Sequence, residues 1–88
     1  MSWFVYILRC SDDSLYTGIS TDVERRLSEH NDTSTRLGAK FTRGRLPVTL
    51  LHQETLASRS AASRREIEIK SLNRNQKLQL IALASAYE

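Results

Sequence analysis

Two tyrosines, an arginine, a histidine and a glutamate are the residues of this chain whose chemistry could form a reactive site. They are Tyr6 and Tyr16, ten residues apart, Arg26 and His30, four apart, and the distant Glu66. Phenols and imidazoles transfer protons, while guanidinium and carboxylate groups carry charges that bind phosphates and metal ions. Whether these groups converge on one pocket depends on the elements that carry them.

The runs 3–9 and 15–20 predict a β-hairpin, because aromatic and β-branched residues flank a polar turn. Side chains alternate between the faces of a strand, so the loop length decides whether the tyrosines share a face. A three-residue loop pairs Tyr6 with Gly18 and puts both hydroxyls on one face, whereas a four-residue loop separates them. We choose the three-residue loop, because Gly18 would leave room beside the Tyr6 ring for a ligand backbone or a phosphate. Both tyrosines could also be ordinary packed strand residues.

Length and composition indicate one small domain, residues 1–88, with a modest core. The single cysteine, Cys10, excludes an internal disulfide and suits a reducing cytoplasm, with a small apolar filler as its expected role. The apolar run at the amino end has six residues, too few for a signal peptide or a membrane span. A net charge of +3 and a pI near 9.4 are a weak indication of a polyanionic partner.

A helix is expected over about residues 22–30, with Thr21 as N-cap and Glu24 reaching back to it in a capping box. Its inward stripe is Val23, Leu27 and His30. Because this helix follows the second strand directly, it lies back against the hairpin and aims Arg26 at the tyrosine face. Alternatively, Arg26 covers the stripe with its aliphatic stem and stays in solvent.

Residues 31–46 predict a loop with one helical turn near 37–42. Ten residues of this loop contain four basic side chains and no acid: Arg36, Lys40, Arg43 and Arg45. These cations could contact phosphates while Phe41 stacks on a base. The other interpretation is a solvated charged loop with Phe41 packed into the core.

A third strand is expected over 48–54, where His52 lacks the partners that a zinc site needs. The last helix runs to about residue 84 and begins with Asn73 and Gln76 in a second capping pattern. Its expected inward residues are Leu78, Ile81 and Ala82.

Between the third strand and the last helix, a further helix is expected to run to about residue 72, with Ser58 as its N-cap. Glu66 lies at the margin of the buried face of this helix, where a carboxylate is costly unless a positive group meets it. That group could belong to a reactive site, or Glu66 could form a structural salt bridge. Arg65 projects nearer the middle of the stripe and could pair with another acid.

This order of residues resembles the GIY-YIG nuclease superfamily over nearly the whole chain, and in particular its small single-domain bacterial YhbQ-like branch. Phe4-Val5-Tyr6 stands where the family has GIY, and Tyr16-Thr17-Gly18 where it has YIG. The segment 22–31 matches the family's helix and 62–70 its later helix. Phe4 and Thr17 depart from the two motifs, which bears on substrate fit.

The resemblance implies an α/β fold: a small, three-stranded, mainly antiparallel sheet with flanking helices. It implies an endonuclease that hydrolyses nucleic-acid phosphodiesters with one Mg²⁺ or Mn²⁺ ion, which Glu66 would bind. Tyr6 would be the general base, although Tyr16 could also take that role. Arg26 would stabilise the phosphoryl charge, and His30 is the recurrent histidine of the helix.

We expect DNA as the substrate, in a repair or processing role, with Arg36, Lys40, Arg43 and Arg45 as the nucleic-acid-binding residues. A protein partner for targeting, a cytoplasmic location, no membrane association and a monomeric or weakly dimeric state are also expected. Two alternatives remain open. One is a nucleic-acid-binding module with little or no turnover, and the other is a small protein-interaction domain.

Overall fold

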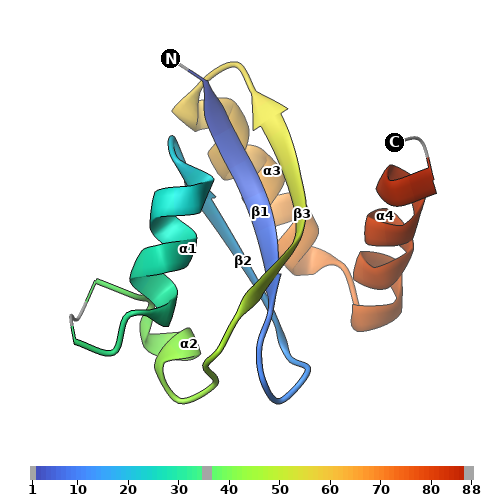
Figure 1. Cartoon of the computed structure of the whole chain (residues 1–88). Helices are drawn as coiled ribbons and strands as arrows, with labels where there is room; N and C mark the ends of the chain where they lie inside the picture. Colours follow the sequence, from blue (N-terminus) through green and yellow to red (C-terminus); the bar gives the residue numbers. More distant parts are fainter. Residues whose placement is uncertain (1, 35–36, 87–88) are drawn as a thin grey trace.

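The computed structural model describes residues 2–34 and 37–86. One antiparallel sheet has the strand order β2-β1-β3, formed by β1 (Trp3–Arg9), β2 (Leu15–Ser20) and β3 (Thr49–Leu56). The helices are α1 (Val23–Asn31), α2 (Lys40–Arg43), α3 (Arg59–Ser71) and α4 (Arg74–Ala86). The α/β fold with a three-stranded sheet and flanking helices is therefore confirmed (Figure 1).

The hairpin between β1 and β2 has the predicted three-residue loop. The Cys10 N–H donates to the Ser14 carbonyl at 2.9 Å, which closes the loop. Asp13 has a φ of 66°, the left-handed conformation that commonly ends a loop of this length. Tyr6 consequently lies opposite Gly18 in the ladder, so both tyrosines project from the same face of the sheet.

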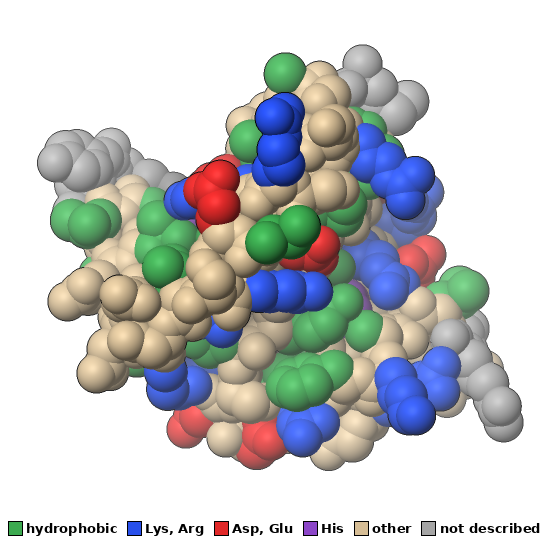
Figure 2. Space-filling model, turned by 180° about the vertical axis from the view of Figure 1, so that it is seen from behind, with side chains coloured by type: hydrophobic (Ala, Val, Ile, Leu, Met, Phe, Trp, Pro, Cys, Tyr) green, Lys and Arg blue, Asp and Glu red, His purple; other side chains and the backbone are tan. Residues whose placement is uncertain are grey.

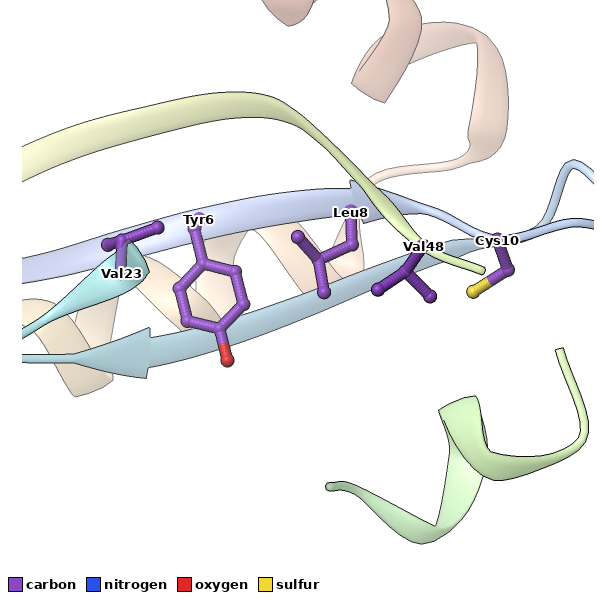
Figure 3. Close-up of a cluster of buried hydrophobic side chains, with 5 residues drawn as sticks. All are labelled: Tyr6, Leu8, Cys10, Val23 and Val48. Carbon is purple, nitrogen blue, oxygen red and sulfur yellow. The ribbon is translucent and has the colours of Figure 1, made fainter. Parts of the chain in front are cut away.

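The sheet separates two hydrophobic clusters. On one face, Tyr6, Leu8 and Cys10 pack with Val23 of α1 and with Val48, as Figure 3 shows. On the other face, Val5 and Ile7 of β1 pack against Ile69 of α3, and side chains of α4 complete the cluster. Figure 1 shows the corresponding arrangement, with α1 on one side of the sheet and α3 on the other.

Two of the three predicted helix starts are confirmed. The Ser58 hydroxyl accepts from the Ala61 N–H, and Asn73 and Gln76 exchange two hydrogen bonds of 2.9 Å. The predicted capping box at Thr21 is wrong, because Asp22 is the N-cap of α1 and accepts from the Arg25 N–H. The Ser20 hydroxyl holds the Asp22 N–H at 3.0 Å and keeps that residue extended, so the helix begins one residue later.

The inward face of α4 is also partly mispredicted. Ile81 does pack against the cluster, but Leu80 packs there as well, while Leu78 is 40% exposed and Ala82 is exposed. Apolar residues occur all around this helix, so their spacing does not select one face. Within residues 2–34 and 37–86, no helix has the length and apolar character needed to cross a membrane.

Candidate active site

The two tyrosine rings lie side by side next to His30. The ring centroids of Tyr6 and Tyr16 are 6.4 Å apart, and the Tyr16 ring is 5.2 Å from the imidazole of His30. Tyr6 is only 1% exposed, whereas Tyr16 is partly exposed. The buried phenol therefore belongs to the interior of the site, and the second phenol forms its outer wall.

The absence of a side chain at Gly18 leaves the space that the Tyr6 hydroxyl occupies. A Cβ atom on Gly18 would lie 2.6 Å from the Tyr6 Oη and 2.8 Å from its Cζ, closer than real Cβ contacts allow. The space beside Gly18 is thus occupied by the phenol itself. Our expectation that this space would receive a ligand backbone or a phosphate is wrong, because the hairpin register points the Tyr6 ring across Gly18.

His30 receives a hydrogen bond from Tyr6 and is oriented by Thr42. The Tyr6 Oη lies 3.1 Å from Nε2, and the Thr42 Oγ1 lies 3.0 Å from Nδ1. The Thr42 hydroxyl donates to the Ala39 carbonyl at 2.9 Å, so its oxygen is left to accept the Nδ1 proton. The Ala39 N–H, at 3.5 Å from Nδ1, is too distant to compete. This network assigns the proton to Nδ1 and leaves Nε2 to accept from the phenol.

Thr42 is fully buried, and sequence reasoning missed it. A threonine within a basic, apolar-poor loop has no distinguishing signal. Its importance follows only from the folding of α2 against α1, which brings Thr42 to His30.

Burial keeps both members of the Tyr6–His30 pair neutral. It raises the pKa of Tyr6 to about 12, with the neighbouring Tyr16 also raising it and the Arg26 guanidinium opposing the change. Burial, assisted by the Arg26 charge, lowers the pKa of His30 to about 4. A phenol would need cationic neighbours to be partly ionised near neutrality, and here burial outweighs the effect of Arg26 on the pKa of Tyr6.

Arg26 lies beside the Tyr6 hydroxyl, which its charge and hydrogen bonding influence. Its Nη1 donates to the Glu29 carboxylate at 3.1 Å and to the Leu37 carbonyl. The guanidinium is thus held at the tyrosine face instead of extending into solvent. Its position agrees with the expected path of α1 from the second strand.

Glu66 reaches the same region from the opposite side of the sheet. Its helix, α3, packs on β1 and on the edge strand β2, and the Glu66 carboxylate contributes to the raised pKa of Tyr6. The side chain is 23% exposed and lies 3.5 Å from the Lys70 ammonium. Arg65 instead pairs with Glu54 at 2.8 Å. Glu66 is therefore partly accessible near the tyrosine cluster, which consists of Tyr6, Tyr16 and His30, and it forms a salt bridge with Lys70.

The predicted nucleic-acid-binding cations are not equivalent. Arg45 pairs with Asp12 at 3.0 Å, donates to the Phe41 carbonyl and lies 4.2 Å above the Phe41 ring, so it holds the loop together. Lys40 and Arg43 are exposed. Arg36 lies outside the described residues.

Phe41 is 41% exposed and stacks on Tyr16, with ring centroids 6.0 Å apart and an interplanar angle of 27°. It therefore forms part of the outer wall of the tyrosine cluster, and the alternative of a ring packed into the core is wrong.

Metal-binding groups are sparse in the part of the chain that the structure describes. No cluster of three or more His, Cys, Asp or Glu side chains could hold an ion there. The Glu66 charge contributes to the raised pKa of Tyr6, so this carboxylate lies near the phenol. A protein-bound ion at this site would consequently have few protein ligands.

A family model of the GIY-YIG catalytic domain matches residues 2–79, and the chain therefore belongs to the GIY-YIG family. Within this family its relatives are the small UPF0213 proteins, in agreement with the YhbQ-like resemblance. The UPF0213 protein of Haloquadratum walsbyi is 60% identical over 77 residues, which cover 88% of this chain and 83% of that relative.

Two solved structures are similar to this fold. The solution NMR structure of a UPF0213 protein from Bacillus halodurans has 46% identity and a TM-score of 0.59, covering 94% of this chain and 85% of that one. The solution NMR structure of a protein from E. faecalis has 36% identity and a TM-score of 0.66, covering 98% and 88%. The family is one of nucleases that are generally dependent on divalent metal ions, whereas the names of these relatives state no activity.

Replacing Gly18 by alanine is expected to destabilise the fold by about 1–3 kcal/mol, because the new methyl group overlaps the buried Tyr6 hydroxyl. Gly44→Ala is the matched control, since nothing lies within 4 Å of the position that its Cβ would take and its φ is −91°. It should change stability by no more than about 0.5 kcal/mol. Urea unfolding measures both, and equal effects would contradict the close approach at Gly18.

Stability should fall by about 2 kcal/mol between pH 7 and pH 5 because of His30. Its pKa is about 4 when folded and 6.5 when unfolded, so the unfolded chain binds more protons as the pH falls through this window. The stabilisation is complete above pH 6.5 and is lost progressively toward pH 4. Urea unfolding at both pH values measures it. His30→Gln should remove most of this dependence and His52→Gln should retain it, whereas retention in His30→Gln would assign the effect to another group.

Proposed function

We propose that this chain is a metal-dependent endonuclease that hydrolyses DNA phosphodiester bonds. The observation that carries the proposal is the meeting of Tyr6, Tyr16, His30 and Arg26 on one face of the sheet, with Glu66 of α3 close enough for its charge to affect the pKa of Tyr6. Two phenols, a guanidinium and an accessible carboxylate at one edge suit a reaction in which negative charge develops on a phosphate.

The donor set fits a single Mg²⁺ or Mn²⁺ ion at Glu66. Mg²⁺ retains several waters and is commonly held by one or two carboxylates together with substrate oxygens, so one accessible carboxylate can suffice. Lys70 is the ion-pair partner of Glu66, and its side chain is more than half exposed, so it can move aside. When bound, the ion would neutralise the scissile phosphate and stabilise the leaving oxygen.

Tyr6 and His30 are proposed to move the proton of the attacking water. The phenol is protonated in the resting protein and donates to His30 Nε2. As the Tyr6 oxygen accepts a proton from water, its own proton passes to Nε2, so no phenolate accumulates. Thr42, a positioning residue, keeps the other imidazole proton on Nδ1.

Arg26 and Tyr16 are proposed to hold the phosphate. The Arg26 guanidinium, beside the phenols, offers planar donors to the charge on the phosphoryl oxygens. Tyr16, the more exposed phenol, faces the substrate and can donate to the same group.

The nucleic-acid backbone is proposed to be contacted by four basic residues of the loop: Lys40 and Arg43, which are exposed, Arg36, and Arg45, which also pairs with Asp12. We also propose a single domain over residues 1–88, a cytoplasmic location, a monomeric or weakly dimeric state, and a repair or processing role that uses a protein partner for targeting. A buried, unpaired Cys10 is compatible with the reducing compartment.

A nucleic-acid-binding module without useful turnover is the second candidate. The burial of Tyr6 and the pKa of about 4 for His30 favour it, because burial restricts the access of water to the phenol and the low pKa makes His30 a weak acceptor of the relayed proton. In this case salt-sensitive binding persists in Glu66→Ala and Tyr6→Phe proteins, and no cleavage occurs with the unaltered chain.

The nuclease proposal predicts nicking of plasmid or branched DNA in Mg²⁺ or Mn²⁺ that Glu66→Gln lowers by about 100-fold or more, since a lost metal ligand costs several kcal/mol. Glu68→Gln is the matched control, because Glu68 lies on the same helix and pairs with Arg65. Gel electrophoresis measures the rate. No nicking by the unaltered protein, or equal nicking by both variants, would refute the proposal.

The two tyrosines should contribute unequally. Tyr6→Phe removes the proton acceptor and should slow nicking by about 100-fold or more, whereas Tyr16→Phe removes one phosphate donor and should slow it about tenfold. Single-turnover rates at saturating metal separate these effects from binding. If Tyr16→Phe slowed nicking more than Tyr6→Phe, the general base would be assigned to Tyr16.

A further inference from the structure

A cavity of about 290 Å³ lies at the β2 edge beside the tyrosine cluster. Its walls come from four elements: Leu15, Tyr16 and Thr17 of β2, Phe41 of α2, Lys70 of α3 and Lys77 of α4. This volume is close to the lower end of the roughly 300–1,000 Å³ range of small-ligand sites, which suits one base-sized group.

The walls combine aromatic rings with positive charge. Tyr16 and Phe41 stack on each other, and Arg45 lies 4.2 Å above the Phe41 ring. Phe41 is still 41% exposed, so a further planar group would contact this remaining surface or displace the guanidinium of Arg45. Lys70 and Lys77 are the charged residues of the lining, which includes no acid. In Figure 2, which shows the back of the molecule, Lys and Arg side chains likewise lie among hydrophobic ones.

Lys77 is held at this edge without an ion-pair partner among the described residues. Three residues earlier, the Arg74 Nη1 donates to the Asp13 carbonyl at 2.7 Å, which ties the start of α4 to the hairpin loop. The capping bonds of Asn73 and Gln76 fix the first turn of the same helix. The position of Lys77 therefore follows from ordered contacts, while its charge is unused within the described part of the chain.

The cavity adjoins the candidate active site. Tyr16 belongs to both, and Lys70 pairs with Glu66 at 3.5 Å. A group bound in the cavity would lie directly next to a phosphate held at the phenols.

We propose that this cavity binds one unpaired nucleotide of the DNA strand next to the scissile phosphate, with its base against Phe41 and its phosphate between Lys70 and Lys77. The proposal rests on the nuclease function and names its substrate class: DNA with an unpaired nucleotide beside the cut. Within a duplex both faces of a base are stacked on the neighbouring base pairs, whereas an unpaired base can turn out of the stack and pack on an aromatic side chain. Lysines supply compact charges for the adjoining phosphate without reading the base.

The test is binding without turnover, measured by fluorescence anisotropy in EDTA at low salt. The probes are a short single-stranded DNA, a strand of equal length with abasic sites, and a blunt duplex. We expect the unaltered protein to bind the base-bearing strand about fivefold or more tightly than the abasic strand, since stacking contributes about 1–3 kcal/mol per base. No preference, or no binding to any probe, would overturn the proposal without requiring a variant.

Two variants and a control test whether the preference for base-bearing DNA arises in this cavity. Phe41→Leu keeps an apolar side chain and should abolish the preference for bases, whereas Lys77→Gln should weaken both single strands about equally, by about threefold or more. Arg59→Gln removes the same charge eleven residues before Lys70, about 16 Å away along α3, and should have little effect. A preserved base preference in Phe41→Leu, or equal losses in Lys77→Gln and Arg59→Gln, would refute the subsite.

The binding test is separate from the nicking test. Nicking without base preference would overturn the subsite and leave the nuclease function standing. Base preference without nicking would retain the nucleotide-binding cavity and refute the nuclease function.

Discussion

The pairing of Tyr6 with Gly18 is the contact on which the candidate site depends. The hairpin register brings these residues opposite each other, and the missing side chain of Gly18 lets the phenol cross the neighbouring strand. The Tyr6 hydroxyl thereby reaches His30, and Tyr16 is placed beside both. A shift of one residue in the register would send the Tyr16 side chain to the opposite face, because strand side chains alternate.

Burial and charge are divided between the interior and the rim of the site. Inside, Tyr6, His30 and Thr42 form a neutral hydrogen-bonded chain with low exposure. At the rim, Arg26 and Glu66 provide opposite charges, each held by an ion pair with a neighbour on its own helix. The neutral chain avoids the cost of burying an unpaired charge, while the rim retains groups that can bind a phosphate or a metal ion.

The site is located at an edge strand, which explains how helices on both faces of the sheet can contribute to it. α1 and α2 cover the tyrosine face, whereas α3 packs on the other face and along β2. In the interior of a wide sheet, residues of α3 would be separated from the phenols by the strands. Here β2 is an edge strand, so Lys70 and Lys77 can line a cavity with Tyr16. Glu66, which pairs with Lys70, lies near enough to raise the pKa of Tyr6.

Local patterns in the sequence determined the hairpin, the three strands, the caps at Ser58 and Asn73, and the family, because each depends on residues close together in the chain or on recognisable motifs. The shared face of the tyrosines also followed, once the loop length was chosen. Tertiary structure decided what occupies the space at Gly18, the proton position on His30 and the packed face of α4. These features depend on contacts between distant elements, such as Thr42 with His30, and on burial, which opposes the charge of Arg26 at Tyr6. No local pattern of residue types records how those elements meet.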